Sequence, residues 1–350
     1  TALVGGVAGP AAGAQSPTET PTPDLPADGS SVHQTADACE FPLNITDATG
    51  TTITLDERPE RITTINPSAA QTLWELGEQD RVVGVTQYAA YLDGAGERAD
   101  VSAEGLGVNV ERVVNTDPDL VLAPNASAGQ VADLRQQNLT VYHFSAATSI
   151  EDIAAKTETV GRLVGNCEAA AETNAEMAQA VAAVENRTAD VDRPAALYPL
   201  GDGYVAANNT FIDSIMTVGG VDNVAAAEGD GYPQLSNEII LQTDPELLIV
   251  TDPDAPILDE EPYASTTAGV EENVVVLNVS YLNQPAPRSV IESTETLADG
   301  VETLQTETDG STADGSAADG EGDSQSQAPG FGVVATLVAA LAAALLARRR

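Results

Sequence analysis

Two acidic residues, Glu111 and Glu238, begin a phrase that the chain contains twice. The first copy reads ERVVNTDPDLVLA and the second reads EIILQTDPELLIV, and the two start 127 positions apart. Thr-Asp-Pro is a common connection between a helix and a strand, because the residue before proline avoids helical dihedral angles. This common connection does not explain why a carboxylate stands at the same place in both preceding helices. The repeat predicts two related lobes, each with one carboxylate able to accept charge-assisted hydrogen bonds.

Other side chains that could do chemistry are few. The chain contains no G-x-S-x-G, no H-E-x-x-H and no P-loop lysine, and His33 and His143 are isolated, so neither an enzyme nor a metal site is expected. Cys39 and Cys167 are far apart and lack C-x-x-C spacing. They are either two buried thiols or, in an oxidising compartment, a disulfide, and we favour the disulfide.

The charge of the chain is strongly negative. Its 350 residues include 14 basic and 54 acidic ones, for a net charge of −40, and Lys156 is its one lysine. Such a field repels phosphate, so we expect no nucleic-acid partner. Acids are spread along the whole chain, which favours a halophilic protein working in high salt over an acidic protein in ordinary salt.

Short apolar runs alternate with helical periodicity along the body of the chain. This rhythm predicts an α/β fold with parallel sheets covered by helices. Strands are expected at residues 62–65, 82–85, 120–123, 141–144, 196–200, 247–250 and 274–277. Helices are expected at about residues 68–77, 109–116, 127–138, 210–219, 236–243 and 287–304.

The middle of the chain, residues 148–190, has no strand signal. Ile153, Thr157, Val160 and Val164 repeat with helical spacing, and the pattern breaks at residues 165–166 before it resumes. We therefore expect a long rigid helix between an N-terminal lobe, 39–147, and a C-terminal lobe, 191–304.

Both ends of the chain differ from its body. Residues 1–14 are small and apolar, as at the end of a secretory signal, and residues 15–38 have the composition of a disordered tether. Residues 305–328 form an acidic Gly/Ser-rich spacer before 329–350, which consist of Pro329, Gly330, Phe331, an apolar run and three arginines. This end resembles the PGF-type sorting signal of haloarchaeal surface proteins, which implies an exported protein anchored by a lipid or a membrane helix.

Several motifs in the body of the chain resemble class III substrate-binding proteins of ABC importers, which capture cobalamin, ferric siderophores or haem. They are RPERITTINPSAAQTLWELGEQDRVVGVTQYAAY, VNVERVVNTDPDLVLAP, TSIEDIAAKTETVGRLVG, VGGVDNVA and YPQLSNEIILQTDPELLIVTDP. Within the family, the residues and spacing of these motifs are most similar to those of members that bind cobalamin. The resemblance implies two lobes joined by one long rigid helix, with the ligand in the cleft between them.

The resemblance also implies the partners. In this family a glutamate on each lobe pairs with arginines of the two permease subunits, and Glu111 and Glu238 match those positions. The expected partner is an ABC permease homodimer with its ATPase subunits, and the expected ligand is a small-molecule macrocycle.

The resemblance places the ligand site in loops at the carboxyl ends of the strands. Cobalamin or a related corrinoid is the expected ligand, without a resident cofactor, and a ferric siderophore or haem is the alternative. Arg288 and Arg98 are the only cations expected near the cleft, too few for an anionic ferric chelate. A surface interaction protein without a small ligand is a second alternative. The ligand-binding candidates are Pro67, Ser68, Tyr88, Gly105, Asn125, Tyr204, Tyr232, Tyr281 and Arg288.

Overall fold

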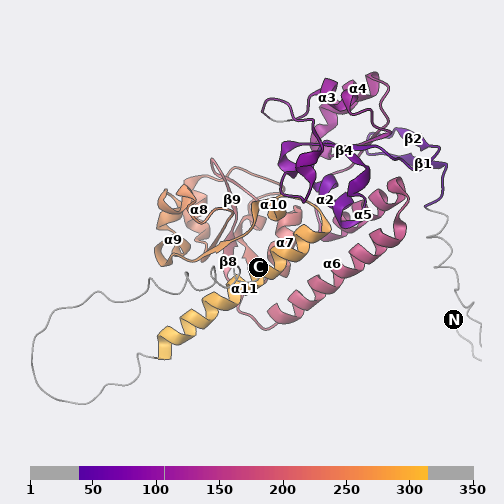
Figure 1. Ribbon diagram of the computed structural model, residues 1–350. Helices are drawn as coiled ribbons and strands as arrows, with labels where there is room; N and C mark the ends of the chain where they lie inside the picture. Colours follow the sequence, from indigo (N-terminus) through magenta and orange to yellow (C-terminus); the bar gives the residue numbers. More distant parts are fainter. Residues whose placement is uncertain (1–38, 106, 314–350) are drawn as a thin grey trace, which may run out of the picture. The chain divides into compact units, whose positions relative to one another are not determined.

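The computed structural model describes residues 39–105 and 107–313. The chain divides into two compact units, one ending at Leu304 and the other running from Gln305 to Arg350. The first unit contains two α/β lobes, drawn in indigo to magenta and in pink to orange in Figure 1. The expected signal remnant, tether and PGF signal lie outside the described residues.

The N-terminal lobe is built on a parallel sheet with the strand order β5-β4-β3-β6-β7. A hairpin of two antiparallel strands precedes it, and the hairpin's alternate apolar residues enter the core of the lobe. The strands are β1 (Leu43–Thr46), β2 (Thr52–Leu55), β3 (Ile62–Thr64), β4 (Val82–Val85), β5 (Ala99–Asp100), β6 (Leu120–Ala123) and β7 (Val141–His143). The helices are α2 (Pro67–Glu75), α3 (Val110–Asn115) and α4 (Ala128–Gln136).

The C-terminal lobe has a parallel sheet with the order β11-β8-β12-β13. A small antiparallel pair, β9 with β10, stands beside it. The strands are β8 (Ala195–Leu197), β9 (Pro199–Gly201), β10 (Tyr204–Val205), β11 (Asp222–Asn223), β12 (Leu247–Val250) and β13 (Val274–Val276). The helices are α7 (Phe211–Val218), α8 (Asn237–Thr243), α9 (Thr267–Glu271), α10 (Val279–Leu282) and α11 (Pro287–Ala313).

The two sheets share one winding order. In each lobe the first strand of the parallel sheet is internal, the second lies on one side of it, and the last two strands, β6 with β7 or β12 with β13, lie on the other side. The N-terminal sheet has one more strand, β5, which extends it beyond β4. The repeated phrase forms α3 and β6 in one lobe and α8 and β12 in the other. Asp117 (φ 47°) and Asp244 (φ 40°) both adopt the left-handed conformation just before the proline. The repeat in sequence is therefore also a repeat in backbone geometry.

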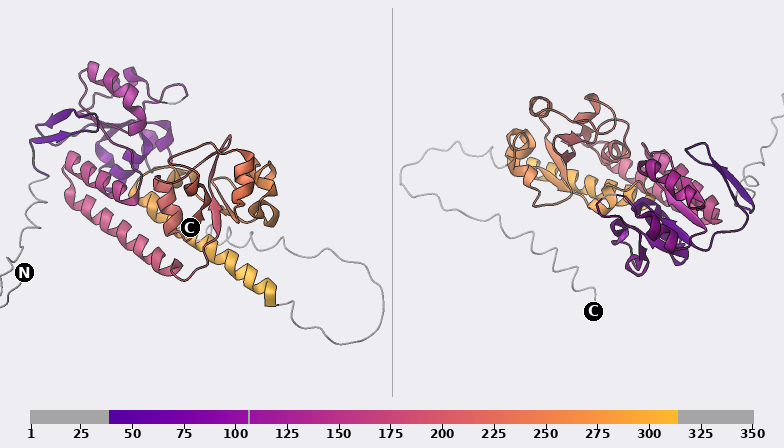
Figure 2. Two further views of the ribbon diagram at one scale, coloured as in Figure 1. Left: turned by 180° about the vertical axis from the view of Figure 1, so that it is seen from behind. Right: turned by 90° about the horizontal axis from the view of Figure 1, so that it is seen from above.

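The connection between the lobes consists of two helices, where one long helix was expected. α5 (Ile150–Val164) ends at Gly165, whose φ of 66° fits glycine best, and α6 (Cys167–Thr188) begins after the N-cap Asn166. The two helices pack side by side, as Figures 1 and 2 show. A left-handed C-cap followed at once by an N-cap reverses the chain, and this reversal replaces a single rod with a helical hairpin.

This helical hairpin belongs to both hydrophobic cores. Ile153 of α5 and Met177 of α6 are buried in the core of the C-terminal lobe, whereas Val160 and Ala170 are buried in that of the N-terminal lobe. Bending between the lobes would have to break packing in both cores, so the connection is stiff. A disulfide between Cys39 and Cys167 ties the start of the described chain to the start of α6.

The expected strands appear at their predicted places, with one division. The apolar run 196–200 forms the end of β8 and the start of β9, because the chain leaves the parallel sheet after Leu197 to pair with β10. α11 continues past the expected end at 304 to Ala313, since extending a formed helix adds one hydrogen bond per ordered residue. Within residues 39–105 and 107–313, no helix is long and apolar enough to cross a membrane.

Candidate functional site

A cavity of about 270 Å³ lies between the lobes, at the carboxyl ends of the parallel strands. On the N-terminal side its walls come from the loops after β3, β6 and β7. Backbone turns position these side chains: Asn66 caps α2 by accepting a hydrogen bond from the Ala69 amide (3.1 Å). The lining residues of this lobe are Asn66, Ser68, Pro124, Asn125, Ala126, Phe144, Ser145, Ala146, Ala147 and Thr148.

The C-terminal lobe closes the other side of the same cavity. Tyr232 supplies an aromatic ring from the loop that precedes α8, and Asn283 supplies an amide from the loop after α10. Asn283 accepts a hydrogen bond from the Tyr198 hydroxyl at 3.1 Å, which orients its side chain. The other lining residues of this lobe are Asn209, Thr210, Phe211 and Pro285. The two lobes together build a mixed apolar and amide-rich site suited to a ligand with both kinds of surface.

Lys156 of α5 lines the cavity between the lobes. Its Nζ donates hydrogen bonds to Ser68 Oγ at 2.7 Å and to the Pro285 carbonyl oxygen at 3.0 Å. It also lies 5.8 Å from the centroid of the Phe144 ring. Burial lowers the pKa of Lys156 to about 7, and the charge of Glu75 partly opposes this effect. The site thus contains an amine that can change its charge near neutral pH.

Sequence reasoning did not place Lys156 in the cleft, although a signal was present. Lys156 stands three positions after Ile153 and four before Val160, so it lies beside the buried face of the helix and is itself half-buried. Arg98, one of the two cations considered for the cleft, instead donates to the Gln79 carbonyl at 3.1 Å and lies 3.9 Å from Asp80. The expectation that arginines alone could supply positive charge to the cleft was therefore wrong.

A second cavity, also about 270 Å³, opens where α2 meets the start of α11. Gln71 holds the lobes together here, because its Nε2 donates to Ser289 Oγ at 3.1 Å and its Oε1 accepts from the Tyr91 hydroxyl at 2.6 Å. The walls are Gln71, Trp74, Glu75, Tyr91, Leu92, Asp93, Tyr281 and Arg288.

Glu75 is the carboxylate of this second cavity that burial affects. Burial raises its pKa to about 7, against the hydrogen bond from Gln71 and the backbone N–H and charge of Arg288. The Arg288 guanidinium stands 5.3 Å from the Tyr281 ring centroid, and Tyr281 meets Tyr91 edge to face. The inter-lobe seam beside the cavity is therefore polar and aromatic.

The nine ligand-binding candidates divide into three groups in the structure. Ser68, Asn125 and Tyr232 line the cavity that contains Lys156. Tyr281 and Arg288 line the second cavity instead. The remaining four line neither cavity: Pro67 is buried at the first turn of α2, the Tyr88 hydroxyl donates to the Gly105 carbonyl at 3.3 Å, and Tyr204 is 47% exposed in β10.

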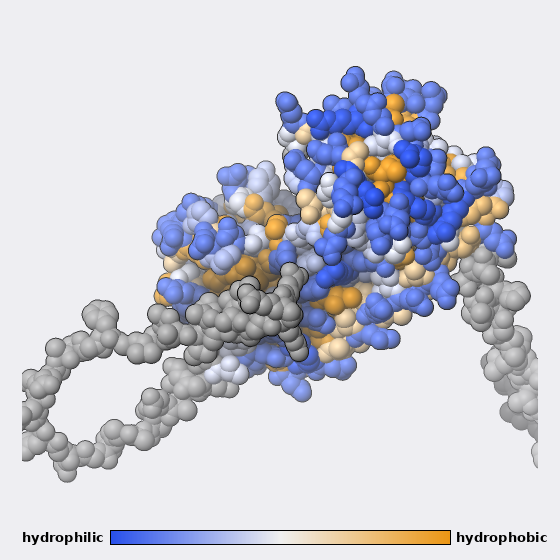
Figure 3. Space-filling view, in the orientation of Figure 1, coloured by the Kyte–Doolittle hydropathy of each residue, from blue (hydrophilic) through white to orange (hydrophobic). Residues whose placement is uncertain are grey.

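Glu111 and Glu238 are both exposed, in the first turns of α3 and α8. Neither forms a salt bridge with another described residue. Figure 3 shows hydrophilic residues over much of the face on view, with hydrophobic patches on both lobes. Two exposed carboxylates without a salt-bridge partner among the described residues are accessible to cationic groups of a partner.

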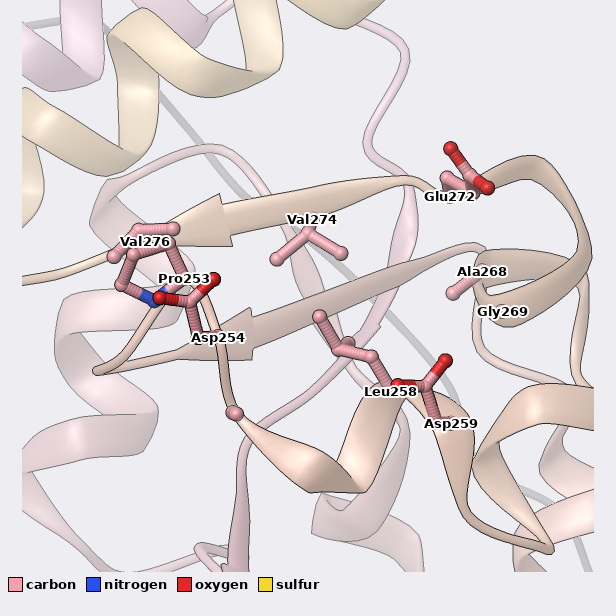
Figure 4. Close-up of a pocket in the computed structure, with 10 residues that line it drawn as sticks. Pro253, Asp254, Leu258, Asp259, Ala268, Gly269, Glu272, Val274 and Val276 are labelled. Atoms are coloured by element: carbon pink, nitrogen blue, oxygen red, sulfur yellow. The ribbon is translucent and has the colours of Figure 1, made fainter.

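A larger hollow, of about 580 Å³, lies in the C-terminal lobe beside β13 and is shown in Figure 4. Val274 and Val276 form one wall, and Asp254, Asp259 and Glu272 surround it. All of its walls come from residues 253–276, so the N-terminal lobe contributes nothing to it. Size alone does not make it the ligand site, because it lacks the convergence of two lobes that the smaller cavity has.

Two family models match the chain. The periplasmic binding protein model matches residues 62–281, which include strands of both lobes and the helical hairpin. The PGF-CTERM motif matches residues 328–350.

Individual proteins extend the likeness. The cobalamin-binding protein of Halobacterium salinarum is 46% identical, and the match covers 91% of each chain. Among solved structures, the periplasmic vitamin B12 binding protein of Vibrio cholerae has a TM-score of 0.61 at 24% identity, covering 71% of this chain and 98% of that one. The apo periplasmic haem-binding protein of Roseiflexus has a TM-score of 0.62 at 22% identity, covering 69% and 99%. These structures share the fold of the two lobes.

Proposed function

The chain belongs to the periplasmic binding protein family, and from this premise we propose that it is the substrate-binding protein of an ABC importer that captures cobalamin or a related corrinoid. It is exported and anchored at the outer face of the membrane through its C-terminal PGF motif. The family consists of binding proteins, and catalysis has no part in the proposed function.

The observation that carries the proposal is the cavity shared by both lobes at the carboxyl ends of their strands. Tyr232 offers a flat apolar face, while Asn125 and Asn283 offer amide groups to the polar edges of a macrocycle. The cavity, about 270 Å³, is smaller than ordinary drug-sized pockets and far smaller than a corrinoid. We infer that it holds one edge of the ligand, with the rest of the ligand between the lobe surfaces.

The partner is an ABC transporter. We propose that the part of it to which the chain docks is a permease homodimer, which works with its ATPase subunits. The equivalent lobes support it, because a two-fold symmetric permease offers two equivalent contacts to a carrier with pseudo-two-fold symmetry. Exposed Glu111 and Glu238 supply the matching carboxylates, and Arg–Glu pairs would orient docking.

Equilibrium titration of the full chain in molar KCl with cyanocobalamin, ferrichrome and haem tests the ligand assignment. Trp74 is the one tryptophan of the chain and lies on α2, six residues from Ser68, or about 9 Å along the helix axis. Its emission should fall on addition of cyanocobalamin, which absorbs light and would bind close by.

Saturable binding of cyanocobalamin with the other two probes weaker supports the proposal. Tighter binding of ferrichrome or haem would mean that the ligand is a ferric siderophore or haem instead of a corrinoid. The fold is compatible with either of these ligands. Failure of all three probes to bind would favour a surface interaction protein without a small ligand.

A further inference from the structure

We propose that Lys156 is a ligand-binding residue whose ammonium group donates a hydrogen bond to an anionic oxygen of the bound molecule, a phosphate or carboxylate oxygen. The inference rests on the proposed function and narrows it, because it requires the ligand to carry such a group on the side that enters the cavity. For a corrinoid this group is the phosphodiester of the nucleotide loop.

The first support is the hydrogen bonding of Lys156. Its Nζ joins the lobes, donating to Ser68 Oγ in one and to the Pro285 carbonyl in the other. An ammonium group has three N–H donors. These two bonds are its only hydrogen bonds within the described part of the chain, and the side chain lines the cavity. One donor is therefore left for a molecule in the cavity.

The second support is the charge around Lys156. No carboxylate among the described residues lies within 4.0 Å of its Nζ. The charge of Glu75 on α2 raises the pKa of Lys156 without direct contact. Arg288 at the start of α11 interacts with the same carboxylate and lowers the pKa of Glu75.

The remaining titratable groups nearby do not neutralise Lys156. Tyr232 faces the cavity from the C-terminal lobe, and burial raises the pKa of its hydroxyl. On α5 itself, Asp152 accepts hydrogen bonds from Thr148, and Glu158 is exposed. A buried cation without a close counter-ion is costly, and a ligand anion would supply the missing charge. In a chain with a net charge of −40, this amine is an unusual point of attraction for an anion.

Binding of an anion should change the protonation of Lys156. Burial lowers its pKa to about 7, so at pH 8 the amine is mostly neutral. A bound anion favours the charged form and raises that pKa. The protein should therefore take up a fraction of a proton, up to about one, when the ligand binds at pH 8.

Calorimetric titration of the full chain at pH 8 in molar KCl, in two buffers with different ionisation enthalpies, measures this proton uptake. The probes are cyanocobalamin, which has the phosphodiester, dicyanocobinamide, which lacks it, and haem, which has carboxylates. The wild type should take up protons with cyanocobalamin and not with dicyanocobinamide. Proton uptake with haem alone would identify a carboxylate as the group that Lys156 binds.

Three variants complete the test. Lys156→Met should abolish proton uptake and weaken cyanocobalamin binding about tenfold or more. Lys156→Arg keeps a permanent charge and should retain most of the affinity without proton uptake. Glu158→Gln lies on an exposed position of the same helix and should behave as the wild type. If Lys156→Met fails to fold, as judged by its unfolding curve, Lys156→Arg still decides through the proton count.

Equal proton uptake by the wild type and Lys156→Arg would overturn the inference. So would a wild type that binds cyanocobalamin or haem without taking up protons, since Lys156 would then only tie the lobes together. If the wild type binds haem with Lys156-dependent proton uptake but binds neither corrinoid, the corrinoid assignment is wrong. The proposed role of Lys156 is supported by the same result.

Discussion

Glu111 and Glu238 occupy the same position in the two lobes, the second residue of a short helix after a capping side chain. Asn109 caps α3 by accepting from the Arg112 amide, and Ser236 caps α8 by accepting from the Ile239 amide. Both glutamates are exposed, and each helix leads through a left-handed aspartate into a strand, β6 or β12, that pairs with the first strand of its parallel sheet. The equivalence of the lobes thus extends to the placement of a single carboxylate.

Reversing both of these charges should abolish uptake and leave ligand capture intact. Glu111→Arg with Glu238→Arg would place cations opposite the arginines that we propose on the permease, and like charges in contact oppose docking. Transport into cells is measured beside the affinity of the purified chain, which should stay within about twofold because neither residue lines the cavity.

The matched control for this double reversal is Glu172→Arg with Glu185→Arg, at exposed positions of α6. It makes the same change in net charge away from α3 and α8 and should leave uptake unchanged. Normal transport by the Glu111/Glu238 variant would refute the docking role.

Among the three tyrosines that are 47% exposed, Tyr232 should matter most for affinity. Tyr232 lines the cavity between the lobes, whereas Tyr88 and Tyr204 do not. Tyr232→Ala should weaken corrinoid binding by about tenfold, as expected for the loss of one aromatic contact. Tyr88→Ala and Tyr204→Ala are the comparison variants in the same titration. A larger effect from either of them would move the ligand away from this cavity.

Loss of the disulfide should lower stability without changing the ligand site. Cys39 and Cys167 are 128 positions apart, so the bond constrains a long segment of the unfolded chain. Cys39→Ser with Cys167→Ser should reduce the free energy of unfolding by about 2 to 5 kcal/mol. Denaturant unfolding with and without reductant measures the effect. Reductant should destabilise the wild type only; an unchanged wild type would mean that the bond adds no stability.

Glu75 should make stability depend on pH between about 4.5 and 7. Its pKa is raised from 4.5 to about 7 by burial, so the folded state binds the proton more tightly than the unfolded state. Its stabilising contribution is present in full below the unfolded pKa and is lost as pH rises through 7. Relative to Glu75→Gln, the wild type should therefore lose about 1 to 3 kcal/mol between pH 4.5 and pH 8.

Urea unfolding of the two proteins across this pH range checks the prediction. Glu185→Gln, an exposed substitution on α6, is the control and should track the wild type. Lys156 acts in a separate window: its lowered pKa should reduce stability as pH falls from about 10.5 to 7. Parallel curves for the wild type and Glu75→Gln at every pH would show that Glu75 titrates alike in both states.

The sequence by itself determined the architecture, because the relevant signals are local. Apolar runs such as 120–123 and 247–250 become buried strands wherever the chain places them, and Thr-Asp-Pro ends the preceding helix through proline's own sterics. The repeat of Glu111 at Glu238 predicted related lobes, and the structure places the repeated phrase on a helix and a following strand in each of two α/β lobes. Gly165 and Asn166 marked the break in the helical segment, although not the reversal that follows it.

Only the tertiary structure decided which side chains meet. Ser68, Lys156 and Pro285 are distant in sequence, and their hydrogen bonds exist because α5 passes between two lobes that fold from separate segments. Tyr232 and Tyr204 have similar sequence surroundings and equal exposure, yet only the packing of the lobes puts the first at the cavity. Helical or strand periodicity fixes which face of an element is buried, whereas a binding site depends on distances between faces, which no local pattern contains.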